Sequence, residues 1–220
     1  MLMTDSFQKN TANSYDNVAA DYAKKFQHEL DHKPFDRKML ELLVERVGDK
    51  GTICDMGCGP GQIAAYVQSL GATACGIDLS PQMVARAQQL NPTISFQQGD
   101  MLDLNGVEDN SFGGMAVFYS IIHIPHEHVV AALRELRRVL HPGGSLLLTF
   151  HIGSEIRHFD EWYEKPVNLD FIFFETQPMT GYLRTAGFVL DEVIERSPYP
   201  DEVATHRAYI FVRKPSNDLR

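Results

Sequence analysis

The stretch that decides the fold is Asp55-Met56-Gly57-Cys58-Gly59-Pro60-Gly61-Gln62, which joins a short apolar run to a helical pattern. Glycine residues permit positive φ angles and a close approach of the backbone to a ligand, and the start of a helix presents free N–H groups. A ligand is therefore expected to lie against this turn. A glycine cluster alone is a weak signal, so the prediction depends on a second element at matching spacing.

That second element is Gly76-Ile77-Asp78, which ends the next apolar run 21 residues after Gly57. A carboxylate at this place in a βαβ unit can accept hydrogen bonds from both hydroxyl groups of a ribose. The alternative is a tight turn followed by a solvated acid at a strand end, which the combined spacing disfavours. The pair therefore points to a ligand that contains adenosine.

The charges near the turn indicate which adenosine ligand fits. The dinucleotide fingerprint Gly-x-Gly-x-x-Gly would require glycine at position 62, where this chain has Gln62. Asp55 lies two residues before the first glycine, where a carboxylate would repel a pyrophosphate and attract an ammonium or a sulfonium group. A cationic adenosine ligand is predicted, and an NAD(P)-dependent oxidoreductase is the disfavoured alternative.

Around this turn, strand and helix patterns alternate along the chain, which is typical of βαβ proteins. The last two strand patterns are consecutive and are separated by a proline-containing turn at 197–201, which favours an antiparallel hairpin at one edge. The predicted fold is an α/β, Rossmann-like three-layer αβα sandwich with a seven-stranded, mostly parallel sheet and an antiparallel edge strand. Strands are expected at 52–56, 73–77, 94–97, 112–119, 144–151, 188–195 and 206–213, and helices near 61–70, 81–90, 127–140 and 177–186.

The length of 220 residues predicts one domain, residues 1–220. Two helical patterns, at about 14–29 and 34–47, precede the sheet and are expected to form a helical cap over 14–47. Residues 152–176 form a loop-rich, aromatic insertion that we expect to act as a lid over the substrate. The alternative is a loop packed against the edge of the sheet.

The composition narrows the possible partners and the location. Acidic residues outnumber basic ones by 29 to 20, giving a net charge of −9, and such a charge repels nucleic acids and anionic bilayers. The chain has no apolar run long enough to span a membrane and no apolar signal segment, which predicts a cytoplasmic protein. Cys54, Cys58 and Cys75 have spacings unsuited to a metal or redox pair, so buried thiols and no metal site are expected.

Four segments in order strongly resemble the successive motifs of the class I S-adenosylmethionine-dependent methyltransferases. The resemblance covers about residues 14–213, and it implies a seven-stranded sheet whose last strand is antiparallel. It also implies S-adenosyl-L-methionine as the cofactor and S-adenosyl-L-homocysteine as the product. The segments are Asp55-Met56-Gly57-Cys58-Gly59-Pro60-Gly61, Gly76-Ile77-Asp78-Leu79-Ser80, Gln98-Gly99-Asp100-Met101 and Leu136-Arg137-Arg138-Val139-Leu140-His141-Pro142-Gly143-Gly144.

The resemblance assigns roles to individual residues. The methionine moiety would lie on the glycine turn, and Asp78 would bind the ribose hydroxyls. The segment 15–22 is similar to the amino-terminal helix that covers the cofactor in small-molecule methyltransferases, and Tyr119 begins a segment similar to theirs after the fourth strand. The residues expected to bind the cofactor are Tyr15, Tyr22, Asp55, Gly57, Cys58, Gly59, Gly61, Asp78, Leu79 and Met83 (adenine face), Asp100 and Met101 (adenine edge), and Tyr119.

The segment after the fourth strand also indicates the kind of acceptor. Methyltransferases that act on base or protein amide nitrogens usually carry an Asn/Asp-Pro-Pro-aromatic motif there, whereas this chain has Val117-Phe118-Tyr119-Ser120. The resemblance therefore implies a small-molecule acceptor. Neither the acceptor atom nor the oligomeric state is predicted.

Methyl transfer from a sulfonium is an in-line displacement of a good leaving group, so positioning and water exclusion can supply most of the acceleration. If a base is used, His123 is the first candidate because it follows the fourth strand at the ligand-binding edge, with His126 and His151 behind it. Tyr15 is the second candidate catalytic residue. A structural or solvated histidine, a packing stripe of Tyr15 and Tyr22, and a non-catalytic S-adenosylmethionine-binding subunit remain the alternatives.

Overall fold

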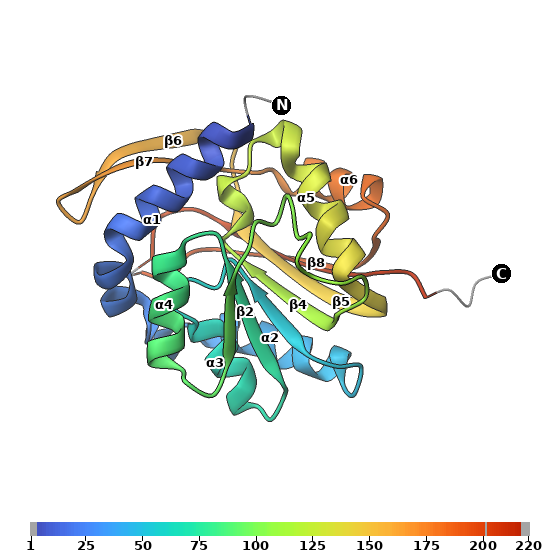
Figure 1. The fold of residues 1–220 in the computed structure, drawn as a ribbon. Helices are drawn as coiled ribbons and strands as arrows, with labels where there is room; N and C mark the ends of the chain where they lie inside the picture. Colours follow the sequence, from blue (N-terminus) through green and yellow to red (C-terminus); the bar gives the residue numbers. More distant parts are fainter. Residues whose placement is uncertain (1–3, 201, 217–220) are drawn as a thin grey trace.

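The computed structural model describes residues 4–200 and 202–216, and its centre is a seven-stranded sheet in the order β3-β2-β1-β4-β5-β9-β8 (Figure 1). Strands β1 to β5 are parallel, whereas β9 runs antiparallel to both of its neighbours, β5 and β8. The predicted sheet and its antiparallel edge hairpin are confirmed, with β8 outermost. The strands are β1 (Ile53–Met56), β2 (Ala74–Asp78), β3 (Ser95–Gln98), β4 (Phe112–Phe118), β5 (Leu140–His151), β8 (Val189–Arg196) and β9 (Arg207–Arg213).

Helices cover both faces of the sheet and complete the three predicted layers. Successive side chains of a buried strand point to opposite faces, and in β5 Leu146 and Leu148 join one hydrophobic core while Leu147 joins the other. The core that contains Leu147 is covered by α2 (Pro34–Val47), α3 (Gln62–Ser69) and α4 (Pro81–Leu90). The opposite core is covered by α5 (His126–Val139) and α6 (Thr176–Thr185).

The strand order reverses between β1 and β4, and open α/β sheets bind ligands at the carboxyl ends of the strands at such a point. Gly57 follows β1 there and Ser120 follows β4 shortly after its end. Ser120 Oγ donates a hydrogen bond of 2.7 Å to the carbonyl of Met56. A Cβ atom placed on Gly57, whose φ is +75°, would lie 2.2 Å from the Ser120 Cβ. The turn can approach β4 this closely only because residue 57 is glycine.

The amino-terminal helix begins earlier than the predicted start at residue 14. Helix α1 spans Thr4–Phe26, and the short 3-10 helix η1 (Glu29–His32) connects it to α2. Residues 4–13 are mostly polar, so hydrophobic periodicity gave no signal for their helical structure.

The prediction of a loop-rich segment over 152–176 is wrong. Most of it forms an antiparallel hairpin of β6 (Ile156–Trp162) and β7 (Lys165–Ile172). Its two turn residues, Tyr163 and Glu164, have φ angles of 54° and 59°. Positive φ at both central residues is the geometry of a type I′ turn, which usually carries Asn-Gly or Asp-Gly. Because neither residue is glycine or asparagine, the sequence contained no hairpin signal.

Helix α1 lies between this hairpin and α4 (Figure 1). Towards the hairpin, Val18 forms a small buried cluster with Val167 and Leu169. Towards α4, the Asp16 carboxylate accepts hydrogen bonds from Ser80 Oγ at 2.6 Å and from the backbone N–H of Gln82 at 3.1 Å. The helix is therefore attached on two sides. Among the described residues, no helix has the length and apolar character needed to cross a bilayer.

Candidate active site

Two adjoining cavities lie at the carboxyl edge of the sheet. The first comprises about 760 Å³ beneath α1, and the second, of about 1650 Å³, extends from the glycine turn to the start of β9; both are partly open to solvent. Because several residues line both, the two spaces meet at the glycine turn. The shared residues are Tyr15, Tyr22, Gly57, Gly59, Phe118 and Tyr119.

The first cavity brings together the residues expected to bind adenosine. Asp78 accepts hydrogen bonds of 2.8 Å from the backbone N–H groups of Gly59 and Ser80, so the carboxylate also stabilises the glycine turn. Asp100 accepts a hydrogen bond of 2.8 Å from the N–H of Leu102. The predicted residues that line this cavity on the strand side are Asp78, Leu79, Met83, Asp100 and Met101.

The second cavity contains the part of the turn expected to hold the methionine moiety. Asp55 and Cys58 line it together with Gly57 and Gly59. Asp55 is 2% exposed, and its carboxylate accepts one hydrogen bond of 3.2 Å, from the N–H of Ala64. Gly61 lines neither cavity, because it lies behind the turn with its Cα facing Phe96 and Asn91.

The carboxyl groups of Asp55, which is buried, and Asp78, which is half-buried, give the site its electrostatic character. Burial raises the pKa of Asp55 to about 8 and the pKa of Asp78 to about 6, and repulsion from Asp78 adds to the shift at Asp55. A cation bound beside them would favour their ionised forms and remove this cost. These two carboxyl groups therefore fit a positively charged ligand better than a pyrophosphate.

Tyr15 and His123 form a hydrogen-bonded pair above the first cavity. Tyr15 Oη lies 2.7 Å from His123 Nε2, and His123 Nδ1 lies 2.8 Å from the carbonyl oxygen of Asp170. A carbonyl can only accept, so Nδ1 carries the proton and Nε2 accepts from the tyrosine hydroxyl. Burial lowers the pKa of His123 to about 4, which keeps the ring neutral. Both ring nitrogens are therefore occupied.

The other candidate histidines lie in different surroundings. His126 packs against Phe174, with 4.7 Å between ring centroids, and lines neither cavity. His151 lines the second cavity and packs against Tyr119, with 4.9 Å between centroids.

Tyr119 has a φ of 50°, a strained value for a residue other than glycine and one that the sequence could not reveal.

Several lining residues were missed by the sequence analysis. Phe7, Gln8 and Thr11 line the first cavity from the beginning of α1. Gln8, Thr11 and Tyr15 are spaced by three and four residues, so they share one helical face, and extending the predicted helix towards the amino terminus would have found them. Ser120 also lines the first cavity, and its closeness to Gly57 depends on the strand order.

These features define a nucleoside-binding α/β protein whose site suits a cationic ligand. Residues 53–144 match the family described as "Methyltransferase domain". A putative methyltransferase of Bacillus subtilis, YqeM, is 29% identical over 140 residues, which cover 61% of this chain and 56% of that protein. Malonyl-[acyl-carrier protein] O-methyltransferase of Pseudescherichia vulneris is 28% identical over 137 residues, covering 60% and 52%.

Magnesium protoporphyrin IX methyltransferase of Synechocystis PCC 6803, solved with bound S-adenosylmethionine, is a structural neighbour. Its TM-score is 0.72 over 95% of this chain and 97% of that one, and at 16% identity it shows a shared fold. The chain is therefore similar in sequence to methyltransferases over residues 53–144, and it shares the fold of a methyltransferase that binds S-adenosylmethionine. The chain spans about half the length of the curated relatives it matches.

Proposed function

We propose that this protein transfers the methyl group of S-adenosylmethionine to a small molecule bound in the second cavity. The observation that carries the proposal is the meeting of two cavities at the glycine turn, beside the buried carboxyl group of Asp55 and the half-buried carboxyl group of Asp78. The concave shape of the second cavity and the net charge of −9 support a small molecule rather than a nucleic acid or a membrane. The cytoplasmic location stays a prediction.

The residues that would hold the cofactor follow from the lining of the two cavities. Asp78 would accept hydrogen bonds from the ribose hydroxyls, and Asp55 with the glycine turn would face the methionine moiety. Leu79 and Met83 would pack on the adenine face, with Asp100 and Met101 at its edge. When bound, S-adenosylmethionine supplies an electrophilic methyl group on a sulfonium that leaves as a neutral thioether.

The chain contributes positioning and exclusion of water. The Trp162 ring lies edge to face with the rings of Tyr15 and Tyr22, at centroid distances of 6.1 and 5.6 Å. This aromatic group separates the junction of the cavities from solvent, and hydrogen bonding to His123 fixes the position of Tyr15. We propose that Tyr15 and His123 act together as the wall beside the methyl group and that the β6–β7 hairpin acts as the lid.

Calorimetry tests the proposed function directly. S-Adenosylmethionine and S-adenosylhomocysteine are expected to bind with dissociation constants in the micromolar range, whereas NADH gives no comparable heat. Transfer of a tritiated methyl group to any member of a small-molecule panel would then separate an enzyme from a non-catalytic binding subunit. Tight binding of NADH without binding of either sulfur compound would contradict the proposal.

The affinity for S-adenosylmethionine is expected to increase as the pH rises from about 6 to about 8, because a cation binds the ionised forms of Asp78 and Asp55. The stability of the ligand-free protein should instead decrease over the same pH range. Neutral Asp55 contributes stability that is complete below its unfolded pKa of about 3.9 and is lost as the pH rises through about 8.

Asp55→Asn is the matched variant, since the amide has nearly the same shape and cannot ionise. It should bind S-adenosylmethionine more weakly than the wild type at pH 8 and lose most of the pH dependence. Without ligand, its melting temperature should fall less than that of the wild type between pH 6 and pH 8. Parallel pH profiles for the two proteins would show that Asp55 does not titrate in this range.

A further inference from the structure

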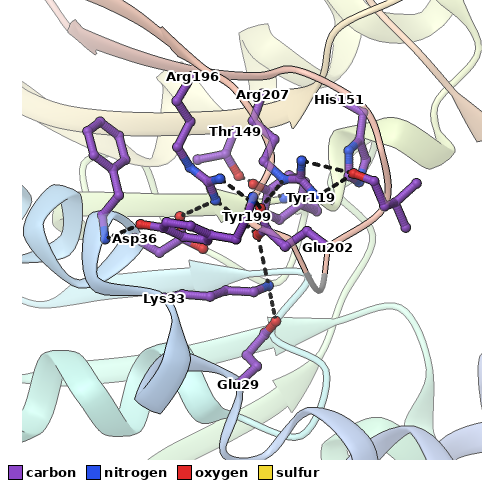
Figure 2. A network of polar contacts seen from close by, with 12 residues as sticks. Glu29, Lys33, Asp36, Tyr119, Thr149, His151, Arg196, Tyr199, Glu202 and Arg207 are labelled. Carbon is purple, nitrogen blue, oxygen red and sulfur yellow. Dashed lines mark hydrogen bonds and ion pairs between the residues drawn. The ribbon is translucent and has the colours of Figure 1, made fainter.

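The end of the second cavity far from the glycine turn contains a cluster of charged and polar side chains that the proposed cofactor contacts do not use (Figure 2). Lys33 is the residue before α2, His151 ends β5 and Arg207 begins β9. Glu202, in the segment between β8 and β9, lies among them. All four line the cavity.

The His151 imidazole is held in place with one nitrogen uncommitted. Its Nδ1 lies 2.8 Å from Thr205 Oγ1, and among the described residues none forms a hydrogen bond with Nε2. The ring packs between Tyr119 and Phe173, at centroid distances of 4.9 and 5.5 Å. Tyr119 also lines the first cavity, so His151 is separated from the junction of the cavities by a single aromatic ring.

The charges around His151 favour an anion. Arg196 donates hydrogen bonds of 2.7 and 3.0 Å to the two carboxylate oxygens of Glu202, and Arg207 Nε lies 3.3 Å from the same group (Figure 2). Arg196 Nη2 also lies 3.3 Å from Asp36 Oδ1, so the two guanidinium groups contact two carboxyl groups, and among the described residues Glu202 is the only acidic partner of Arg207. The remaining hydrogen bonds of Arg207 go to neutral backbone carbonyls, those of Val203 and Thr205.

The remaining groups of the cluster are one cation, Lys33, and two further carboxyl groups, those of Glu29 and Asp36. Lys33 lies 2.5 Å from Glu29 and 4.0 Å from Glu202. Burial raises the pKa of Asp36, whose carboxyl accepts a hydrogen bond from the Tyr209 hydroxyl. Burial lowers the pKa of His151 to about 4, and Arg207, Lys33 and Arg157 lower it further while Glu202 opposes them. The imidazole is therefore neutral in the ligand-free protein, and negative charge developing on an oxygen bound beside Nε2 would raise its pKa again.

We propose that the acceptor carries an acidic hydroxyl group, as a phenol or an enol does, and that its oxygen binds between His151 and Arg207. The inference rests on the proposed function. A hydroxyl that donates to Nε2 gains negative charge as the proton moves, and the neighbouring guanidinium stabilises that charge. His123 cannot serve in the same way, because Tyr15 and Asp170 occupy both of its nitrogens.

The chemical step balances with these groups alone. The acceptor oxygen forms a bond to the methyl carbon, and the bond between that carbon and sulfur breaks with its electron pair remaining on sulfur. The hydroxyl proton passes to Nε2 of His151, which requires the tautomer in which Nδ1–H donates to Thr205 Oγ1, 2.8 Å away. The imidazolium then releases the proton to solvent. The products are a methyl ether, S-adenosylhomocysteine and a proton.

The test uses 4-nitrophenol, whose ionised form absorbs visible light, added to the complete chain saturated with S-adenosylhomocysteine. No methyl group is present, so the absorbance reports binding and ionisation without turnover. Bound probe is expected to ionise at a pH about one unit lower than free probe, which is about a tenfold change in the ionisation constant. The probe is much smaller than the cavity of about 1650 Å³, so size does not prevent binding.

His151→Gln should reduce this shift to the part that Arg207 supplies, while leaving the calorimetric affinity for S-adenosylhomocysteine unchanged. His141→Gln is the matched control, because His141 lies at the opposite end of the same strand and lines neither cavity. Thr205→Val should reduce the shift by releasing the ring. Binding of S-adenosylhomocysteine without a shift, or an equal shift in His151→Gln, would overturn this inference alone, whereas failure of S-adenosylhomocysteine to bind would overturn the proposed function as well.

Discussion

Replacing Asp78 with alanine is expected to weaken the binding of S-adenosylhomocysteine at least tenfold. Each charge-assisted hydrogen bond from a ribose hydroxyl contributes roughly 1.5–3 kcal/mol, and about 1.4 kcal/mol corresponds to a factor of ten. The variant should also be less stable than the wild type, because the buried N–H groups of Gly59 and Ser80 lose their acceptor. Calorimetry gives the affinity, and thermal unfolding without ligand gives the stability.

Two further variants separate these effects. Asp78→Asn retains one acceptor oxygen and should recover part of the stability while still binding the ligand weakly. Asp103→Ala removes an exposed carboxylate that does not line the first cavity, and it should behave like the wild type. An affinity of Asp78→Ala equal to that of the wild type would place the ribose elsewhere.

Gly57→Ala is expected to destabilise the protein by roughly 2–5 kcal/mol, because it combines overpacking with a side chain in the left-handed region. The added Cβ would lie 2.2 Å from the Ser120 Cβ, at a φ of +75°. Relieving that clash moves the turn away from β4 and distorts the wall shared by both cavities. Urea unfolding measures the loss of stability, and calorimetry should show a lower affinity for S-adenosylhomocysteine.

Gly71→Ala is the matched control, since Gly71 has a φ of +88° and no atom within 4 Å of an added Cβ. It should lower the free energy of unfolding by only about 1–2 kcal/mol, the penalty for a side chain in the left-handed region. In a double-mutant cycle, Ser120→Gly should restore part of the stability lost in Gly57→Ala. Equal losses in Gly57→Ala and Gly71→Ala would show that the contact with Ser120 is unimportant.

The residues that line the first cavity on the strand side were predictable because they follow strand ends in the order of the sequence. Asp55 and Asp78 end consecutive parallel strands, and parallel pairing alone brings their carboxyl groups to one edge of the sheet. The buried strands also had apolar runs that differ clearly from the flanking helices. Their bounds were therefore predicted to within a few residues.

The second cavity depends on features that local sequence does not encode. The hairpin after β5 turns at Tyr163-Glu164 with both φ angles positive, and no glycine or asparagine marks that turn. The polar cluster joins residues from α2, β5, and the β8–β9 region, so only the folded chain brings His151 and Arg207 together. The hydrogen bond that occupies His123 joins residues 15 and 123 and was equally invisible.

The wall of the acceptor cavity has a consequence for how this protein can diverge from its relatives. Trp162 and Phe171 come from the hairpin, Lys33 from the connection between the first helices, and Glu202 from the segment before β9. All of them lie outside residues 53–144, the part of the chain that matches the family. Under the proposed function, changes in these peripheral segments are therefore expected to alter which acceptor binds while leaving the central strands and the glycine turn intact.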